Sequence, residues 1–405
     1  MQSINSNTFQ VIAVIFFAFF IRVFWVFMIA PYFPNALGGA DWLLADKLQG
    51  NSILDEVSPD FNQIYDPAAR NLLLGNGFAD ADGNLTAYVG PGYSAVLAII
   101  YSIFGYSLLP IRLIQILLDL ITCYAVGSIA VKLISANFRL PSMIIYALYP
   151  LAFYQTGIVV TETLCTFAVA VSMMFYFKGV IIREDNGFFF IPITLAFLLS
   201  GLFLGFSALV RPNTLPLLIP MSLYLFHNGV NSKSLKNFFL FNIGVSIFVI
   251  TWIIRNYLIF DSFIPISSII YSTYADLDGS IQSSMLELLY KKINILFADP
   301  LGEINFLFSR LFSVWFDTSS GELDFYVGLL QAPFVIFSFA GLFMLKKNSK
   351  TILSFFCILF FIITIVYLSK NALARYTVPI VPIMIPYLLY FIKISLVKAK
   401  ILKKV

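Results

Sequence analysis

The chain is built from long apolar runs that are separated by short polar segments. A helix that crosses a bilayer needs about 20 mostly apolar residues in succession. The runs of about that length cover residues 9–30, 111–133, 141–160, 163–182, 188–208, 212–227, 237–254, 326–345, 351–368 and 374–393. This pattern predicts an all-α polytopic membrane protein with about ten transmembrane helices, in a range of about nine to twelve.

One further apolar run, at 92–104, is too short to cross a bilayer with ease. It is bounded by Pro91-Gly92 at one end and Gly105 at the other. We expect it to form a helix that lies along the outer membrane surface. Counting it as a membrane span would invert the orientation of every later helix.

The distribution of basic residues predicts the orientation, because cytoplasmic loops carry an excess of Lys and Arg. With the N-terminus inside, the inner segments contain 14 basic residues and only two acids, Glu184 and Asp185. The basic residues are Lys132, Arg139, Lys178, Arg183, Lys233, Lys236, Lys346, Lys347, Lys350, Lys393, Lys398, Lys400, Lys403 and Lys404. We therefore expect a multi-pass plasma (inner) membrane protein with both termini cytoplasmic.

The composition is typical of an integral membrane protein. It is 60% hydrophobic and 11% charged, with a mean hydropathy of +0.90, whereas a soluble domain has about 25% charged residues. The net charge of +4 therefore indicates no nucleic-acid partner. Cys123, Cys165 and Cys357 lie in apolar runs without metal or disulfide spacing, and His227 is the single histidine. A histidine metal site and a Ser/His/Asp triad are thereby disfavoured.

Two long outer loops, 31–91 and 255–325, carry most of the acidic residues of this single domain of residues 1–405. The second includes an amphipathic stretch near 281–296. The acids of the first are Asp41, Asp46, Asp55, Glu56, Asp60, Asp66, Asp80 and Asp82. Charges at the edge of a bilayer are costly, so each is a candidate for function.

Asp60 precedes a predicted short helix that begins near Pro67 and ends near Gly75 and Gly77. Its carboxylate could accept a proton from an acceptor hydroxyl. Alternatively, Asp60 or Asp66 caps the helix, and the spacing alone does not separate these interpretations.

Other polar residues lie at helix ends or within helices. Glu162 stands at the outer end of a predicted membrane helix, where a lone acid is more often solvated than functional. Arg112, Gln115 and Asp119 share one face of a helix. A polar face of this kind favours a structural role in joining helices.

Three arginines lie at outer helix ends, in Arg211-Pro212-Asn213, Arg255-Asn256 and Arg375-Tyr376. A guanidinium there can bind a phosphate in a bidentate fashion. The alternative is ordinary interfacial anchoring by Arg and Tyr.

Together these segments resemble the C-type (GT-C) membrane glycosyltransferases, in the superfamily of the protein O-mannosyltransferases, the aminoarabinose-lipid A transferases and bacterial family 39-like enzymes. The resemblance extends over most of the chain. The matching elements are Asp60 with Tyr65 to Phe78, Pro91-Gly92-Tyr93 to Phe104-Gly105, Tyr149-Pro150 with Thr161-Glu162, Arg211-Pro212, Trp252 to Asn256, and Arg375-Tyr376 to Pro379.

The resemblance implies a GT-C fold and an inverting glycosyltransferase of hexosyl or pentosyl type, acting on the extracytoplasmic face. It implies a polyprenyl-phosphate sugar as donor, membrane lipids as partners, and a glycolipid, surface glycan or protein as acceptor. Asp60 would be the general base and Glu162 a second acid that positions the acceptor or a metal. The donor phosphate would be held by Arg211, Arg255 and Arg375, with supporting roles for Tyr65, Arg70, Tyr93, Asn256 and Tyr376.

The chain departs from the family pattern at two points. Many members carry an Asp-Glu pair four residues before the tyrosine, whereas Asp60 is five residues before Tyr65 and Phe61 follows it. Asp66, Asp55 and Asp41 therefore remain alternative bases. Residues 88–90 replace a Glu-Lys pair of some relatives, so no cofactor is certain, and a divalent metal stays open with its ligands unknown.

Two other functions remain as alternatives. A transporter or flippase of lipid-linked glycans would carry charges deep in its membrane helices, and Arg22 and Asp119 keep that alternative open. A polymerase or ligase of surface polysaccharide would use a lipid-linked donor but transfer a longer glycan.

Overall fold

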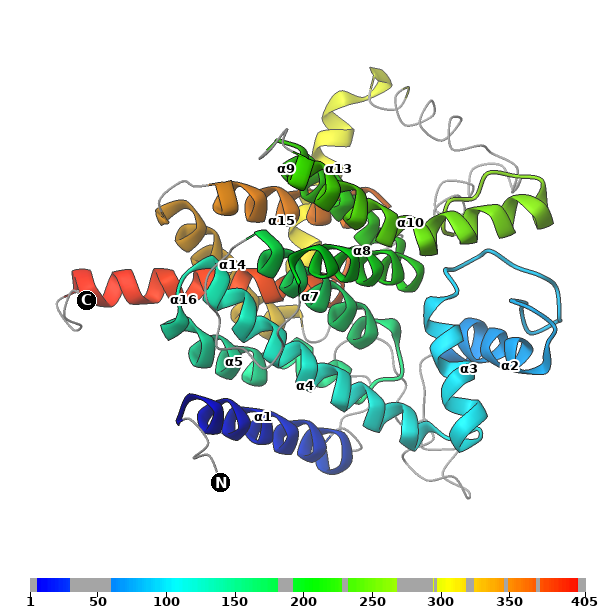
Figure 1. Cartoon of the computed structure of the whole chain (residues 1–405), viewed down its shortest axis with the longest axis horizontal. Helices are drawn as coiled ribbons and strands as arrows, with labels where there is room; N and C mark the ends of the chain where they lie inside the picture. The colour runs from blue at the N-terminus through cyan, green and yellow to red at the C-terminus, as the bar shows by residue number, and fades with distance from the viewer. Residues whose placement is uncertain are drawn as a thin grey trace.

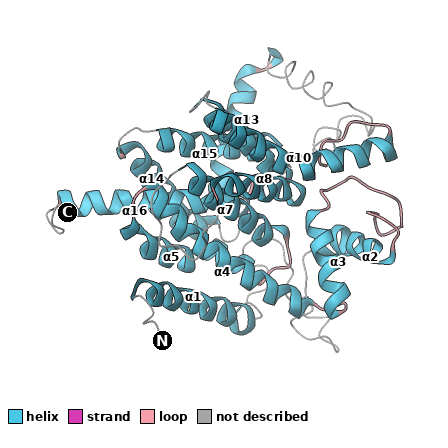
Figure 2. Ribbon diagram, in the orientation of Figure 1, coloured by secondary structure: helices cyan, strands magenta, loops and turns pink. Residues whose placement is uncertain are grey.

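The computed structural model describes residues 6–29, 60–180, 192–227, 232–267, 294, 297–317, 324–345, 349–368 and 372–399. Within these ranges the regular elements are helices, and the one β-type contact is an isolated bridge between Ala79 and Leu85 (Figures 1 and 2). The predicted candidates Asp41, Asp46, Asp55 and Glu56 lie outside the described residues, as does most of the stretch 281–296.

Eight helices in the described part of the chain are long and apolar enough to cross a membrane. The predicted all-α polytopic fold is thereby confirmed. These helices are α1 (Ser6–Phe24) continued by η1 (Trp25–Ile29), α4 (Leu108–Leu133), α7 (Thr161–Val180), α8 (Ile193–Val210), α10 (Ser232–Phe260), α14 (Asp324–Met344), α15 (Ser349–Leu368), and η8 (Ala374–Ile380) continued by α16 (Val381–Lys398).

The other two predicted spans are interrupted. The run 141–160 contains α5 (Arg139–Leu148) and α6 (Pro150–Gln155), and the run 212–227 contains η7 (Pro212–Leu217) and α9 (Leu218–His227). Tyr149 is extended, with φ −71° and ψ 112°. The ring of a proline disfavours the helical backbone conformation of the residue before it, so the helix ends at Tyr149. Pro216 similarly lies inside the tight turns of η7.

The short helices α2 (Asp66–Leu74) and α3 (Gly92–Phe104) lie together at one end of the helical body. The first residues of α1 and the last residues of α16 lie at the other end (Figure 1). Gly75 ends α2 in the left-handed region at φ 84°, and α3 has the predicted bounds. In Figure 1, α3 runs across the direction of α4. Its position along a membrane surface remains a prediction.

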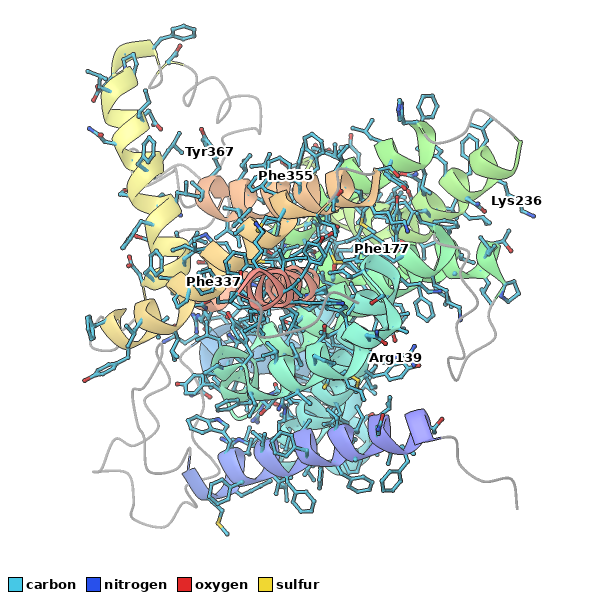
Figure 3. All side chains as sticks on the ribbon, turned by 90° about the vertical axis from the view of Figure 1, so that its left-hand side faces the viewer. Arg139, Phe177, Lys236, Phe337, Phe355 and Tyr367 are labelled. Atoms are coloured by element: carbon cyan, nitrogen blue, oxygen red, sulfur yellow. The ribbon has the colours of Figure 1, made fainter. Side chains whose placement is uncertain are left out.

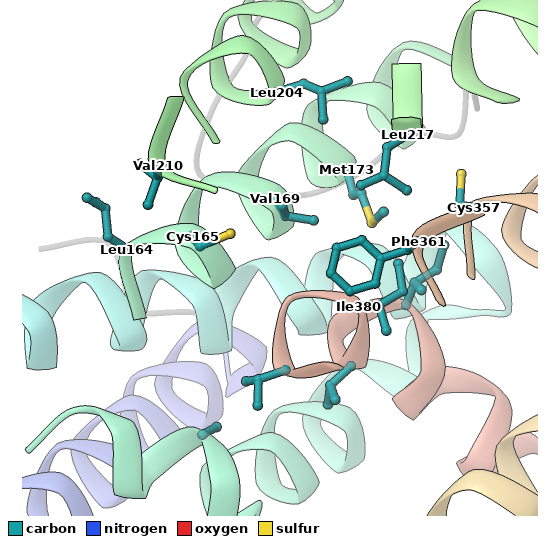
Figure 4. Packing of buried hydrophobic residues seen from close by; sticks show 14 of the residues in the cluster. Leu164, Cys165, Val169, Met173, Leu204, Val210, Leu217, Cys357, Phe361 and Ile380 are labelled. Carbon is teal, nitrogen blue, oxygen red and sulfur yellow. The ribbon is translucent and has the colours of Figure 1, made fainter. Parts of the chain in front are cut away.

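The core is apolar and closely packed around α7. Cys165, Val169 and Met173 of α7 lie near Leu204 of α8 and Phe361 of α15 (Figure 4). The three cysteines are buried and unbridged. In Figure 3, α16 is seen end-on in the middle of the helical body, and α13 (Pro300–Phe316) lies at the edge of the body.

Small residues let α8 and α10 approach closely, as is common between membrane helices. A Cβ atom at Gly201 would lie 2.0 Å from the carbonyl oxygen of Phe241, and one at Gly244 would lie 2.6 Å from that of Leu198. These glycines therefore fix the backbone separation of the two helices.

A buried ion pair joins α1 to α4. Arg22 Nε lies 2.6 Å from Asp119 Oδ2, and the hydroxyl of Tyr146 on α5 donates to Asp119 Oδ1 at 2.6 Å. Arg22 also donates to the carbonyl oxygens of Tyr146 and Ala147. Charges in a low-dielectric interior need partners of this kind. The contacts support the structural interpretation of Asp119.

Candidate active site

Glu162 is the centre of a buried charge cluster at the start of α7. Its side chain is 2% exposed, and its Oε1 atom lies 2.7 Å from Arg211 Nη1 and 3.4 Å from Arg375 Nε. Its Oε2 atom accepts a hydrogen bond from Thr161 Oγ1 at 3.2 Å. Burial of an unpaired carboxylate would be costly, so Glu162 is a compensated buried ion and not a solvated interfacial acid.

The two arginines reach Glu162 from separate elements. Arg211 directly follows α8 in an extended conformation, with φ −144° and ψ 118°, which the next residue, Pro212, favours. Arg375 is in the first turn of η8. Packing of α7, α8 and η8 therefore brings together two of the three predicted phosphate-binding arginines.

Tyr376 stacks with this cluster. The Cζ atoms of Arg211 and Arg375 lie 4.2 and 5.3 Å from the centre of its ring. Burial by itself lowers the pKa of Arg211, but the Glu162 carboxylate outweighs that effect and the pKa is raised. Both guanidinium groups therefore stay charged beside the aromatic ring, a geometry in which cation–π attraction adds to the ion pairs.

The cluster has a net charge of +1, from two guanidinium groups and one carboxylate. The arginine side chains are 18% and 15% exposed, whereas that of Glu162 is 2% exposed. The two arginine side chains thus keep some contact with solvent, whereas the carboxylate has almost none. This arrangement is suited to binding an anion through charge-assisted hydrogen bonds.

Arg255, the third predicted phosphate ligand, makes its contacts elsewhere. Its Nη1 donates to the carbonyl oxygen of Thr86 at 2.8 Å, and its Nη2 donates to that of Phe78 at 3.1 Å. Its Cζ lies 4.7 Å from the ring centre of Trp252. The neighbouring Asn256 donates to the Ile264 carbonyl oxygen at 3.0 Å. Both residues therefore hold loop backbone against the end of α10.

Asp60 and Asp66 have different surroundings. Asp60 directly precedes η5 (Phe61–Tyr65); it is exposed and makes no side-chain capping hydrogen bond. Asp66 Oδ2 lies 2.7 Å from Arg70 Nε, and its Oδ1 accepts from the Tyr101 hydroxyl at 2.6 Å. Asp66 thus joins α2 to α3. Of these two candidate bases, Asp66 has a carboxylate held by an ion pair and a hydrogen bond, whereas the carboxylate of Asp60 is exposed.

Tyr65 is the last residue of η5 and lies within electrostatic reach of the charge cluster. Its ring packs edge-to-face on that of Tyr93, with centroids 5.2 Å apart. Burial is the main cause that raises the pKa of Tyr65; Arg211 opposes the rise, and Glu162 and Asp60 add to it. The phenol therefore remains a protonated donor within electrostatic reach of all three groups.

The Gly90-Pro91-Gly92 segment before α3 has a packing role that was not predicted from the sequence. A Cβ atom at Gly90 would lie 2.2 Å from the carbonyl oxygen of Leu209, and one at Gly92 would lie 2.8 Å from the amide nitrogen of Val210. The two glycines therefore allow the start of α3 to press against the end of α8, directly before Arg211. The repeated glycine around Pro91 was the available signal for such a close approach.

Within the described ranges, no group of three or more His, Cys, Asp or Glu side chains is placed to hold a metal ion. Glu162, the predicted second acid, faces two arginines instead. Nearby positive charge of this kind opposes cation binding, so the described residues at this cluster do not fit a metal.

Residues 89–254 match a family model described as dolichyl-phosphate-mannose-protein mannosyltransferase. No curated protein matches the chain. The structure is similar to that of an Archaeoglobus fulgidus oligosaccharyltransferase in the apo form, with 14% identity and a TM-score of 0.53. It is also similar to the archaeal oligosaccharyltransferase AglB from that organism, in complex with an inhibitory peptide and a dolichol-phosphate, with 13% identity and a TM-score of 0.55.

The apo match covers 97% of this chain and 52% of the other, and the AglB match covers 97% and 51%. The chain therefore spans about half the length of the solved structures that it matches. At these identities the likeness establishes the fold alone. The predicted GT-C fold is thereby confirmed, and the family-model match over residues 89–254 confirms the predicted resemblance to that superfamily.

Proposed function

From the C-type glycosyltransferase fold of this chain, we propose that it is an inverting membrane glycosyltransferase that uses a polyprenyl-phosphate sugar. The observation that carries this proposal is the pair Arg211 and Arg375, converging on Glu162 with a net charge of +1. The family description names a dolichyl-phosphate-mannose donor, and a structural neighbour is in complex with a dolichol-phosphate. Both are consistent with a lipid-linked donor.

Arg211 and Arg375 hold the donor phosphate in this mechanism. As the bond between the anomeric carbon and the phosphate oxygen breaks, its electron pair leaves with that oxygen. The leaving group then needs neutralisation of its charge, which preorganised guanidinium groups supply. Glu162 holds both arginines in place and is itself withdrawn from the acceptor.

Asp60 acts as the general base. The acceptor hydroxyl oxygen attacks the anomeric carbon from the face opposite the phosphate, so the configuration inverts. Its proton passes to the Asp60 carboxylate, and general-base assistance of this type contributes about 10²- to 10⁴-fold. Tyr65 and Tyr376 lie beside the two halves of the site and, we propose, orient donor and acceptor.

The reaction takes place, we propose, on the extracytoplasmic face of the plasma membrane, with both termini cytoplasmic. Two observations support this orientation: the basic residues of the predicted inner segments, and the location of α2 and α3 away from the start of α1 and the end of α16. The transferred group is a hexose or pentose, and the acceptor is a hydroxyl of a glycolipid, surface glycan or protein.

The alternative functions have less support. A transporter needs charges that face a passage near the midplane, but Arg22 and Asp119 face each other between α1 and α4. A polymerase or ligase would use the same cluster, and only the length of the transferred glycan distinguishes it.

The decisive experiment supplies purified protein in proteoliposomes with labelled polyprenyl-phosphate sugars and a membrane extract as acceptor source. We expect a covalent product whose mass exceeds that of its acceptor by one sugar. A flippase would move label without forming a product, and a ligase would add a longer glycan.

The Asp60→Asn variant tests the base in the same assay. We expect a loss of activity of about 10²-fold or more, with a normal melting temperature, because Asp60 is exposed and makes no capping hydrogen bond. Asp82→Asn is the matched control, since Asp82 is another exposed acid of the same loop. Full activity of Asp60→Asn would show that another group removes the proton.

A further inference from the structure

An irregular stretch of buried backbone, residues 156–160, connects α6 to α7 directly before Glu162. Thr156, Ile158 and Val159 are at most 3% exposed. Irregular backbone that is buried in protein requires protein partners for its carbonyl groups, because bulk water does not reach them. The groups that satisfy these carbonyls therefore help to set the position of Glu162.

Gln115 of α4 supplies partners for two of these carbonyls and for the carbonyl of Gln155 directly before them. Its Nε2 atom lies 2.8 Å from the carbonyl oxygen of Ile158, 3.1 Å from that of Thr156 and 3.5 Å from that of Gln155. One turn earlier on α4, Arg112 Nε donates to the Gly157 carbonyl oxygen at 3.1 Å. The polar face of α4 thus replaces water along the stretch that leads to Glu162.

The other end of the Gln115 carboxamide reaches the acceptor side. Its Oε1 atom accepts a hydrogen bond from the hydroxyl of Tyr93 on α3 at 3.3 Å. The ring of Tyr93 packs on Tyr65, which belongs to η5, the helix that Asp60 directly precedes. The Gln115 side chain is 3% exposed. It therefore links the backbone before Glu162 to Tyr93, which packs on the segment that follows Asp60.

A second link leads from the same stretch to Arg375. Gln155 Nε2 donates to the carbonyl oxygen of Arg375 at 3.4 Å, and Thr163 Oγ1 donates to the carbonyl oxygen of Gln155 at 3.0 Å. The position of Gln155 thus affects the backbone of a phosphate-binding arginine as well as the first turn of α7.

We propose that Gln115 is a positioning residue that sets the distance between the Asp60 base and the Arg211–Glu162–Arg375 cluster. This inference rests on the proposed glycosyltransferase function. In-line attack requires the acceptor oxygen and the donor phosphate to be aligned, and a misplacement of about 1 Å can reduce the rate about 10²-fold. Gln115 touches no substrate and acts through Tyr93 and the 155–158 carbonyls.

The test compares kcat, donor KM and melting temperature for Tyr93→Phe, Gln115→Met and the double variant, in the proteoliposome assay. Tyr93→Phe removes only the link to α3. We expect its kcat per folded enzyme to fall about tenfold with donor KM unchanged, because the phosphate site keeps its supports. Gln115→Met removes both links, so we expect a larger loss of kcat and an increased donor KM.

The double variant tests whether the two residues act as one unit. If they do, Tyr93→Phe causes no further loss in the Gln115→Met background. Tyr387→Phe is the matched control: its hydroxyl donates to Ser354 Oγ at 2.7 Å, it is equally buried, and it lies 12 residues beyond Arg375. We expect this control to lower the melting temperature without changing kcat.

An unchanged kcat for Tyr93→Phe, with only a stability loss like that of Tyr387→Phe, would overturn the positioning role. Independent, multiplying effects of the two substitutions would overturn it as well. Should Gln115→Met fail to fold, the comparison of kcat between Tyr93→Phe and Tyr387→Phe still tests the positioning role. Absence of sugar transfer by the wild-type protein would refute the proposed function, and this role with it.

Discussion

The Glu162→Gln substitution is the most direct probe of the charge cluster. It removes the negative charge that lies 2.7 Å from Arg211 Nη1 and 3.4 Å from Arg375 Nε, while the shape of the side chain is kept. Two guanidinium groups that are 18% and 15% exposed then repel each other without compensation. Loss of one partner of a buried pair costs about 3–5 kcal/mol, and we expect about 3 kcal/mol here because both arginines retain some contact with solvent.

The assay is the free energy of unfolding in mixed micelles, measured with and without polyprenyl phosphate. A phosphate bound between the arginines would replace part of the lost charge. The lipid should therefore stabilise Glu162→Gln more than it stabilises the wild-type protein. A second substitution, Arg211→Gln, should recover part of the lost stability because it removes one of the uncompensated charges.

A stability loss below about 0.5 kcal/mol, typical of a surface substitution, would show that Glu162 is solvated or that its charge does not stabilise the cluster. Equal stabilisation of both proteins by polyprenyl phosphate would separately refute phosphate binding at this cluster. The control is Asp82→Asn, which also removes one negative charge but from an exposed acidic side chain. It measures the general effect of losing one negative charge.

Three further predictions concern the donor, the packing of α3 and the orientation. Arg375→Ala should raise the donor KM by about tenfold or more, because a charge-assisted hydrogen bond contributes roughly 1.5–3 kcal/mol; an unchanged KM in a donor titration would remove Arg375 from the phosphate site. Gly90→Ala should reduce activity strongly, since its Cβ would lie 2.2 Å from the Leu209 carbonyl oxygen, whereas Gly328→Ala should be harmless because its nearest neighbour is at 3.6 Å; equal activities of the two variants would contradict the close-contact argument. A cysteine introduced by Asp82→Cys should react with an impermeant maleimide in intact cells, and labelling only after lysis would reverse the topology.

Several features followed from the sequence because their causes are local. The bounds of α3 matched the prediction, since Pro91 and Gly105 set them within a few residues of backbone. The apolar runs predicted the membrane helices because a helix that crosses the bilayer must be apolar along its whole length. The break at Tyr149-Pro150 was equally local, although the run 141–160 was predicted as one span.

The site was only partly predictable, because its residues meet through helix packing. Glu162, Arg211 and Arg375 were each identified as candidates at helix ends, but only the arrangement of α7, α8 and η8 shows that they converge. The same type of helix-end signal pointed to Arg255, whose hydrogen bonds go instead to the backbone of residues 78 and 86.

Asp60 and Asp66 show the same division between local and tertiary information. Both are acids beside one short helix, and their spacing could not separate a base from a cap. The hydroxyl of Tyr101, 35 residues further along the chain, engages Asp66 and leaves Asp60 as the exposed carboxylate. The sequence alone thus predicted most of the long apolar helices and the polar residues at their ends. Which of those residues meet was decided only by the tertiary structure, because pairing depends on the distances between elements far apart in the chain.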